Sequence, residues 1–239
     1  MERYNIFITD TLKDPFYGVL GNIIALWVLA VAGYYIIFPF FGYELSYNAE
    51  PIRIAGYFLF WGAVSMAYFW KLFSKWLVAS AHIWVYFALS LGFAGVLLGL
   101  LYIFAQLPAP QGASLAPNTD ILFATPWYFL PKSAEILVQQ ILITILVLDL
   151  HYRFHSFKSV LMGYALCFGG AHVLLFLITG APTPYATIMT LGALFSTFIF
   201  PYLILRVRGG FVYAYAIHFA FYILLAMILH TLPPPGYGG

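Results

Sequence analysis

Three ionisable side chains stand inside apolar stretches of this chain, where an ionisable group is costly and marks a candidate functional site. Glu135 opens the apolar run 133–148, His172 lies within 159–179, and His218 lies within 211–230. Imidazole nitrogens and carboxylate oxygens bind zinc, and a carboxylate beside the metal can take a proton from water. One glutamate and two histidines on three separate helices therefore form a possible metal site.

The neighbours of Glu135 extend this polar region. Gln139 lies four residues later and therefore shares a helical face with Glu135, and Gln140 flanks both. A charged side chain at this depth must face protein or water. In the alternative interpretation, Glu135 lies at the outer rim of its helix and reaches solvent beside Lys132.

Each histidine is paired with an aromatic residue one helical turn away. Phe168 precedes His172 by four residues, and Tyr222 follows His218 by four. These aromatic residues are supporting members of the predicted site. In the alternative interpretation, each histidine has a structural role and is satisfied by a neighbouring backbone carbonyl.

The composition identifies a protein of the membrane. Of 239 residues, 64% are hydrophobic and 8% are charged, which leaves too little polar surface to cover a soluble globule. The formal net charge is +2, and the charged residues sit mostly between apolar runs, so no basic face indicates a nucleic-acid partner. The lipid bilayer is the first partner that this composition predicts.

Seven apolar runs are long enough to cross about 30 Å of hydrocarbon. The predicted spans are 17–37, 54–70, 77–104, 133–148, 159–179, 185–205 and 211–230. We expect an all-α, polytopic transmembrane bundle in which residues 1–239 form one membrane domain. Within the third span, Gly95 and Gly99 are spaced to let a neighbouring helix approach closely.

The distribution of Lys and Arg predicts the orientation of this bundle, because these residues are enriched on the cytoplasmic side. With the N-terminus in the cytosol and the C-terminus outside, eight of the ten basic residues fall inside. They are Arg3, Lys13, Lys71, Lys75, Arg153, Lys158, Arg206 and Arg208. We expect an integral protein of a bacterial inner (plasma) membrane.

The order of these helices resembles the CPBP family of intramembrane metalloproteases, which includes CAAX-processing endopeptidases and bacteriocin-immunity-type relatives. The resemblance covers about residues 131–225. Phe168 and His172 match the family's Phe-x-x-x-His motif, and residues 203–210 and 214–218 are similar to its basic turn and final histidine helix. The resemblance implies that His172 and His218 are metal ligands and that Glu135 belongs to the family's glutamate pair.

The chain departs from the family pattern at three polar positions. Where the family has a glutamate pair followed by an arginine, this chain has Ala134 beside Glu135, and Gln139 in place of the arginine. Tyr222 stands where the family has Asn or Asp. These changes favour a non-catalytic binding or scaffold subunit of a membrane assembly, in which other membrane proteins are the partners. The alternative is an active zinc endopeptidase that acts on prenylated or transmembrane substrates, with Glu135 as base and Tyr222 as a hydrogen-bond donor.

A second alternative is a b-type haem electron carrier. His82 would pair with His218 at one depth, and His172 with His230 at another. Against it, His218 and His230 are twelve residues apart, which places them about 120° apart around one helix.

Overall fold

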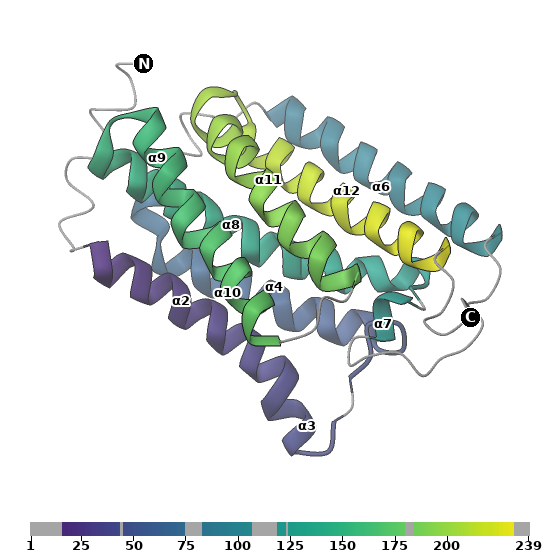
Figure 1. The fold of residues 1–239 in the computed structure, drawn as a ribbon. Helices are drawn as coiled ribbons and strands as arrows, with labels where there is room; N and C mark the ends of the chain where they lie inside the picture. The colour runs from purple at the N-terminus through teal and green to yellow at the C-terminus, as the bar shows by residue number, and fades with distance from the viewer. Residues whose placement is uncertain are drawn as a thin grey trace, which may run out of the picture.

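The computed structural model describes residues 16–43, 45–74, 83–106, 119–122, 124–179 and 184–231, and within these ranges the only regular elements are helices. Each of the seven predicted runs overlaps one of them (Figure 1). In chain order the elements are α2 (Phe16–Ala32), the π-helix η1 (Gly33–Ile37), α3 (Phe38–Phe40), α4 (Pro51–Tyr68), α6 (Ile83–Gln106), α7 (Thr119–Leu122), the 3₁₀-helix η2 (Pro126–Tyr128), α8 (Phe129–Phe154), α9 (Phe157–Tyr164), the π-helix η3 (Ala165–Gly169), α10 (Gly170–Thr179), α11 (Pro184–Arg206) and α12 (Gly210–Thr231).

Five helical runs in the described residues are long and apolar enough to cross a membrane. They are Gly18–Phe40, Pro126–Phe154, Phe157–Leu174, Thr187–Arg206 and Gly210–Ile228. α4 and α6 overlap the two remaining predicted spans and are not among these five. α4 has 18 residues and carries the charged Arg53 as its third residue. α6 has 24 residues, and its shorter run Leu91–Leu100 is apolar among those with described side chains. The count of seven spans therefore stays a prediction.

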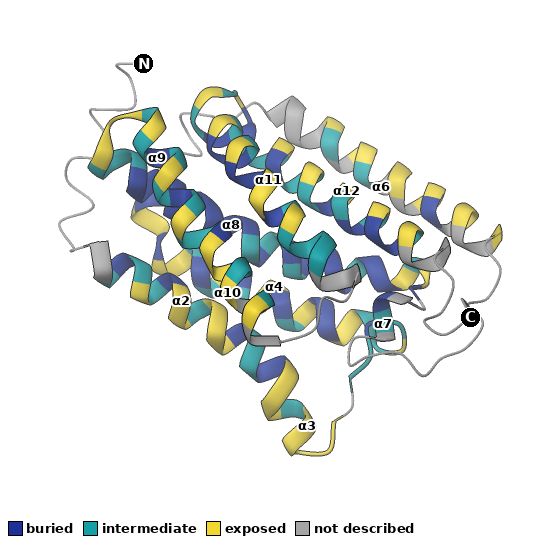
Figure 2. Cartoon of the chain, in the orientation of Figure 1, coloured by how far each residue is buried: buried dark blue, intermediate teal, exposed yellow. Residues whose placement is uncertain are grey.

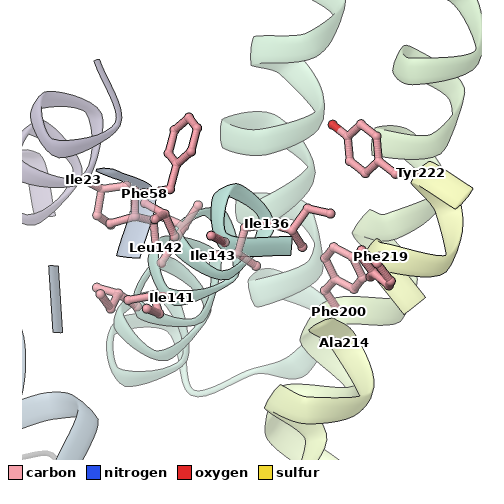
Figure 3. Close-up of a cluster of buried hydrophobic side chains, with 14 of the residues drawn as sticks. Ile23, Phe58, Ile136, Ile141, Leu142, Ile143, Phe200, Ala214, Phe219 and Tyr222 are labelled. Atoms are coloured by element: carbon pink, nitrogen blue, oxygen red, sulfur yellow. The ribbon is translucent and has the colours of Figure 1, made fainter. Parts of the chain in front are cut away.

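α8 is the central helix of the bundle. It packs against α2, α4, α9, α11 and α12, and almost all of its residues are buried, whereas α2, α6 and α11 present many exposed residues (Figure 2). Its side chains point to both sides. Leu142 lies with Ile23 and Phe58 of α2 and α4, and Ile136 lies toward Phe200 and Phe219 of α11 and α12 (Figure 3).

α8 is also longer than the run 133–148 that we predicted. It begins at Phe129 and continues to Phe154, where His155 takes a left-handed conformation with φ 53°. The extension past residue 148 contains Asp149 and Arg153, which form an ion pair four residues apart. Such a pair stabilises a helix, and it allows α8 to continue beyond its apolar run.

The two ends of the bundle can be told apart by contacts between distant segments. At one end, Phe73 meets Phe211 at 5.7 Å between ring centroids, and the Arg206 guanidinium lies over the Phe157 ring at 5.3 Å. At the other end, the connection between α3 and α4 is bonded to α7 through Asp120. Of the basic residues that we predicted on one side of the membrane, those described lie in segments that meet at this first end, and Arg3, Lys13 and Lys75 lie outside the described residues. Which compartment that end faces stays a prediction.

Candidate functional site

Both carboxylate oxygens of Glu135 are bonded. Lys132 Nζ lies 2.7 Å from Glu135 Oε2, and the Tyr47 hydroxyl donates to the same oxygen at 2.9 Å. The side-chain amide of Gln139 donates to Oε1 at 2.9 Å. Lys132 and Gln139 reach Glu135 because residues three and four apart in a helix are neighbours on its surface.

The predicted shared face of Glu135 and Gln139 is therefore confirmed by a hydrogen bond. Lys132 does lie beside Glu135, as the alternative interpretation expected, and both side chains are largely covered by protein. The side chains of Lys132 and Glu135 are 8% and 12% exposed. Their charges are satisfied inside the protein by each other and by hydrogen bonds, which is the condition for burying an ion pair.

Tyr47 reaches Glu135 from the connection between α3 and α4, which a second carboxylate holds in place. Asp120 of α7 accepts from the Tyr47 backbone N–H and from the Ser46 hydroxyl, each at 2.9 Å. The Asn48 amide donates to the Asp120 backbone carbonyl at 3.0 Å. Burial, and after it the nearby negative charge of Glu135, raises the pKa of Tyr47 well above its usual range, so its hydroxyl stays protonated as a donor.

Two residues of α12 complete this region. Lys132 Nζ lies 4.0 Å from the centre of the Tyr222 ring, close enough for a cation–π interaction. The His218 ring is 5.7 Å from the Tyr222 ring and 5.6 Å from the Phe200 ring. The Nδ1 atom of His218 is buried and has no hydrogen-bond partner among the described residues.

His172 of α10 is fixed by the preceding turn. Its Nδ1 lies 2.9 Å from the Phe168 carbonyl oxygen, and its ring packs on the Phe168 ring at 4.6 Å. Because a carbonyl can only accept, Nδ1 carries the proton and Nε2 has the lone pair. The carbonyl contact agrees with the structural interpretation of His172, and Nε2, to which no described residue is bonded, leaves the metal-ligand interpretation open. Phe168 lies in the π-helix η3, and its ring stacks on Tyr164 at 5.2 Å.

The structure places the predicted residues on the predicted helices and joins only some of them. Glu135 is bonded to Gln139 and Lys132, Lys132 lies against the Tyr222 ring, and His218 lies next to Tyr222. Lys132 and His172 both lie within electrostatic reach of His218. No contact in the described part of the chain joins Glu135 directly to either histidine.

The predicted zinc site can be tested against these donors. Within the described residues, no three His, Cys, Asp or Glu side chains lie close enough together to hold one metal ion. Glu135 accepts from Lys132 and Tyr47 at Oε2 and from Gln139 at Oε1. Zinc binding therefore stays a prediction.

The haem alternative cannot be followed through its four histidines. His82 lies outside the described residues, and so does the side chain of His230 on α12. His172 and His218 have the environments given above. The haem alternative therefore stays a prediction.

Three residues of this site were not predicted to have their observed roles. The sequence analysis did not select Tyr47 and Asp120, and it treated Lys132 only as a route for Glu135 to solvent. The spacing of Lys132 and Glu135 could have indicated an ion pair within the helix. Tyr47 is 88 residues from Glu135, and no local pattern indicates that contact.

No family profile, no curated protein and no solved structure matches this chain. The resemblance to the CPBP family therefore stays a prediction that rests on the motifs around Glu135, His172 and His218.

Proposed function

We propose that this chain is a non-catalytic membrane protein that keeps a CPBP-like helical core and acts by binding other membrane proteins. The observation that carries the proposal is the bonding of Glu135. A general base needs a lone pair directed at water, but three of the roughly four lone pairs of this carboxylate are engaged, two on Oε2 by Lys132 and Tyr47 and one on Oε1 by Gln139. Glu135 acts as a structural partner of these groups.

The ion pair also opposes a role for Glu135 as a metal ligand. The Lys132 ammonium group lies 2.7 Å from Oε2, where a cation would have to bind, and a metal would have to displace it. Lys132 is itself buried, so its displaced charge would lose its partner. In this proposal the changes at Ala134, Gln139 and Tyr222 accompany the conversion of a catalytic glutamate into a structural one.

α6 offers the surface for a partner in this proposal. Ala88, Gly92, Gly95 and Gly99 are exposed, and a Cβ added to any of the three glycines would meet no atom within 4 Å. Their spacing puts them on one face of the helix. Small residues let a helix of another chain approach closely in a membrane, where packing is a main source of association energy. We place this assembly in a bacterial plasma membrane, with the N-terminus inside and the C-terminus outside.

An active zinc endopeptidase is the second candidate, and one observation favours it. Among the described residues, no hydrogen bond reaches His172 Nε2 and none reaches the buried Nδ1 of His218, so each histidine retains a nitrogen that could bind a metal. An endopeptidase would also need Glu135 to leave Lys132. The two candidates therefore differ in the role of Glu135.

A cleavage assay separates the two candidates. The purified protein would be incubated with a prenylated peptide and with a transmembrane peptide, with and without a chelator, beside Glu135→Gln and the matched control Glu50→Gln. We expect no chelator-sensitive turnover in any of the three proteins. Turnover that the chelator stops, and that Glu135→Gln abolishes while Glu50→Gln retains it, would show that Glu135 is a catalytic base.

The binding role has its own test. In mildly solubilised native membranes, we expect the wild-type chain to migrate in an assembly that contains other membrane proteins. Gly95→Leu combined with Gly99→Leu should release it, because side chains at these positions hold a neighbouring helix away. Ala220→Leu, at an exposed small residue of α12, is the matched control and should leave the assembly intact. Migration of the wild type as a free monomer would contradict the binding role.

A further inference from the structure

Basic side chains gather at the end of the bundle where α8 leads into α9 and α11 leads into α12. The two turns carry Arg153, His155, Lys158, Arg206 and Arg208. From residue 150 to the C-terminus the sequence contains no Asp or Glu. Every charged side chain after residue 149 is therefore basic.

The two turns lie side by side. Arg206 covers the ring of Phe157 at 5.3 Å, and the Phe157 ring lies 6.4 Å from that of Tyr202. His151, in the last turn of α8, lies within electrostatic reach of both His155 and Arg206. Figure 1 shows the start of α9 and the turn between α11 and α12 at the same end of the bundle.

The turn between α11 and α12 has a fixed shape. Gly209 has a positive φ of 72°, and a Cβ on Gly210 would collide with the Leu203 carbonyl. Only glycine fits both requirements at low cost. This geometry fixes the backbone next to Arg208 at the start of α12.

The described residues supply little negative charge to offset these groups. Asp149 is fully buried and accepts two hydrogen bonds from Arg153, each at 2.9 Å. Glu50, Asp120 and Glu135, the other described carboxylates, belong to the opposite end. Lys158 and Arg208 are exposed, and no described carboxylate lies against them.

Helix termini add to this positive potential. α9 begins at Phe157, and the side chain of its N-cap residue, Ser156, makes no capping hydrogen bond. α12 begins at Gly210. Unpaired N–H groups at a helix start attract anions, and a cation such as Lys158 in the first turn is unfavourable unless an anion lies nearby.

Apolar side chains surround this basic region. Phe154, Met162 and Tyr202 are exposed, at 50%, 59% and 52%. An anion bound between the two turns would therefore lie next to exposed apolar helix surface, against which acyl chains can pack. A phospholipid has both parts, because its phosphate is an anion and its chains are apolar.

We propose that these two turns bind the phosphate of an anionic phospholipid. Lys158 and Arg208 supply positive charge, and the first turn of α9 supplies backbone N–H groups. The acyl chains lie along Phe154, Met162 and Tyr202. This inference rests on the membrane location in the proposed function and is independent of whether Glu135 is catalytic.

Native mass spectrometry of the detergent-purified full-length chain tests this site. Dioleoyl phosphatidylglycerol and dioleoyl phosphatidylcholine would be titrated separately into the wild type, into Lys158→Gln combined with Arg208→Gln, and into Arg53→Gln. The wild type should retain phosphatidylglycerol preferentially. Loss of two surface charges should weaken that retention about thirtyfold and leave phosphatidylcholine unchanged. Arg53 is an exposed arginine at the opposite end, so Arg53→Gln should bind both lipids as the wild type does.

Three results would overturn the assignment. The first is equal retention of phosphatidylglycerol by the double variant and the wild type, and the second is an equal loss in Arg53→Gln. The third is displacement of phosphatidylglycerol by an excess of inorganic phosphate, which would show a site for a free anion. Melting temperatures of all variants would be compared to verify folding. The cleavage assay of the proposed function does not depend on this lipid, so failure of either proposal can be recognised separately.

Discussion

Charged side chains lie in opposite environments at the two ends of this bundle. At the end near α7, Lys132, Glu135 and Asp120 lie against the protein interior and each is bonded to a partner. At the end with the two turns, Lys158 and Arg208 are exposed. Buried pairs hold segments in one arrangement, whereas exposed charges of one sign can act on molecules outside the chain.

The buried end connects segments that are far apart in sequence. Asp120 holds Ser46 and Tyr47, and Tyr47 in turn donates to Glu135, so α7 and the connection before α4 are bonded to α8. Removing one of these side chains leaves another buried polar group without its partner, which lowers the free energy of unfolding. At the exposed end, Lys158 and Arg208 have no such dependence, because both side chains are exposed. The variants below test this contrast.

The largest loss of stability is expected from Lys132→Met. It leaves the Glu135 carboxylate largely buried without its counter-charge, which should lower the free energy of unfolding by about 3–5 kcal/mol. Lys158→Met removes the same kind of side chain from the exposed end. It should change the free energy of unfolding by less than about 0.5 kcal/mol. Denaturation of the detergent-solubilised proteins measures both. Equal effects would remove the distinction between the two ends.

Asp120→Ala should have the next largest effect. It removes the acceptor of two hydrogen bonds, from the Ser46 hydroxyl and the Tyr47 backbone N–H, and should cost about 2–3 kcal/mol. It should also expose the connection before α4 to protease. Glu50→Ala breaks an exposed pair with Arg53 and should cost less than about 1 kcal/mol. Unchanged protease resistance of Asp120→Ala would show that α7 does not hold this connection.

The smallest effects are expected from two adjacent glutamines, and they should differ in sign. Gln139→Leu removes a donor to Glu135 and should lower the free energy of unfolding by about 1 kcal/mol. Gln140 is fully buried, and neither polar atom of its amide has a partner among the described residues. Gln140→Leu should therefore raise the free energy of unfolding by about 1 kcal/mol. Destabilisation by Gln140→Leu would reveal a partner for that amide.

Much of the helical arrangement could be predicted, because a long apolar run in a membrane has few alternatives to a helix. The limits of the runs were less accurate. We ended the fourth run at residue 148, but the Asp149–Arg153 pair continues α8 to Phe154. The π-helix at 165–169 was also not predicted. Its extra residue per turn depends on packing, for which no sequence signal was available.

Contacts within one helix could be predicted in the candidate site, and contacts between segments could not. The four-residue spacing of Glu135 and Gln139 and of Phe168 and His172 indicated neighbours that the structure confirms. The partnership of Tyr47 with Glu135 depends on how α4 and α8 pack, which residue spacing does not contain. The sequence also could not show whether Glu135 reaches solvent beside Lys132 or forms an ion pair with Lys132 inside the protein.

The account depends most on the claim that Glu135 is held by Lys132 as a structural partner. A double-mutant cycle with Lys132→Met, Glu135→Gln and the combined variant measures this directly as a coupling free energy of unfolding. We predict a coupling of about 2 kcal/mol or more, because each single change leaves the other group largely buried with its charge or hydrogen bonds incomplete. Effects that add to within about 0.5 kcal/mol would contradict the account, since Glu135 would then be independent of Lys132 and available for chemistry.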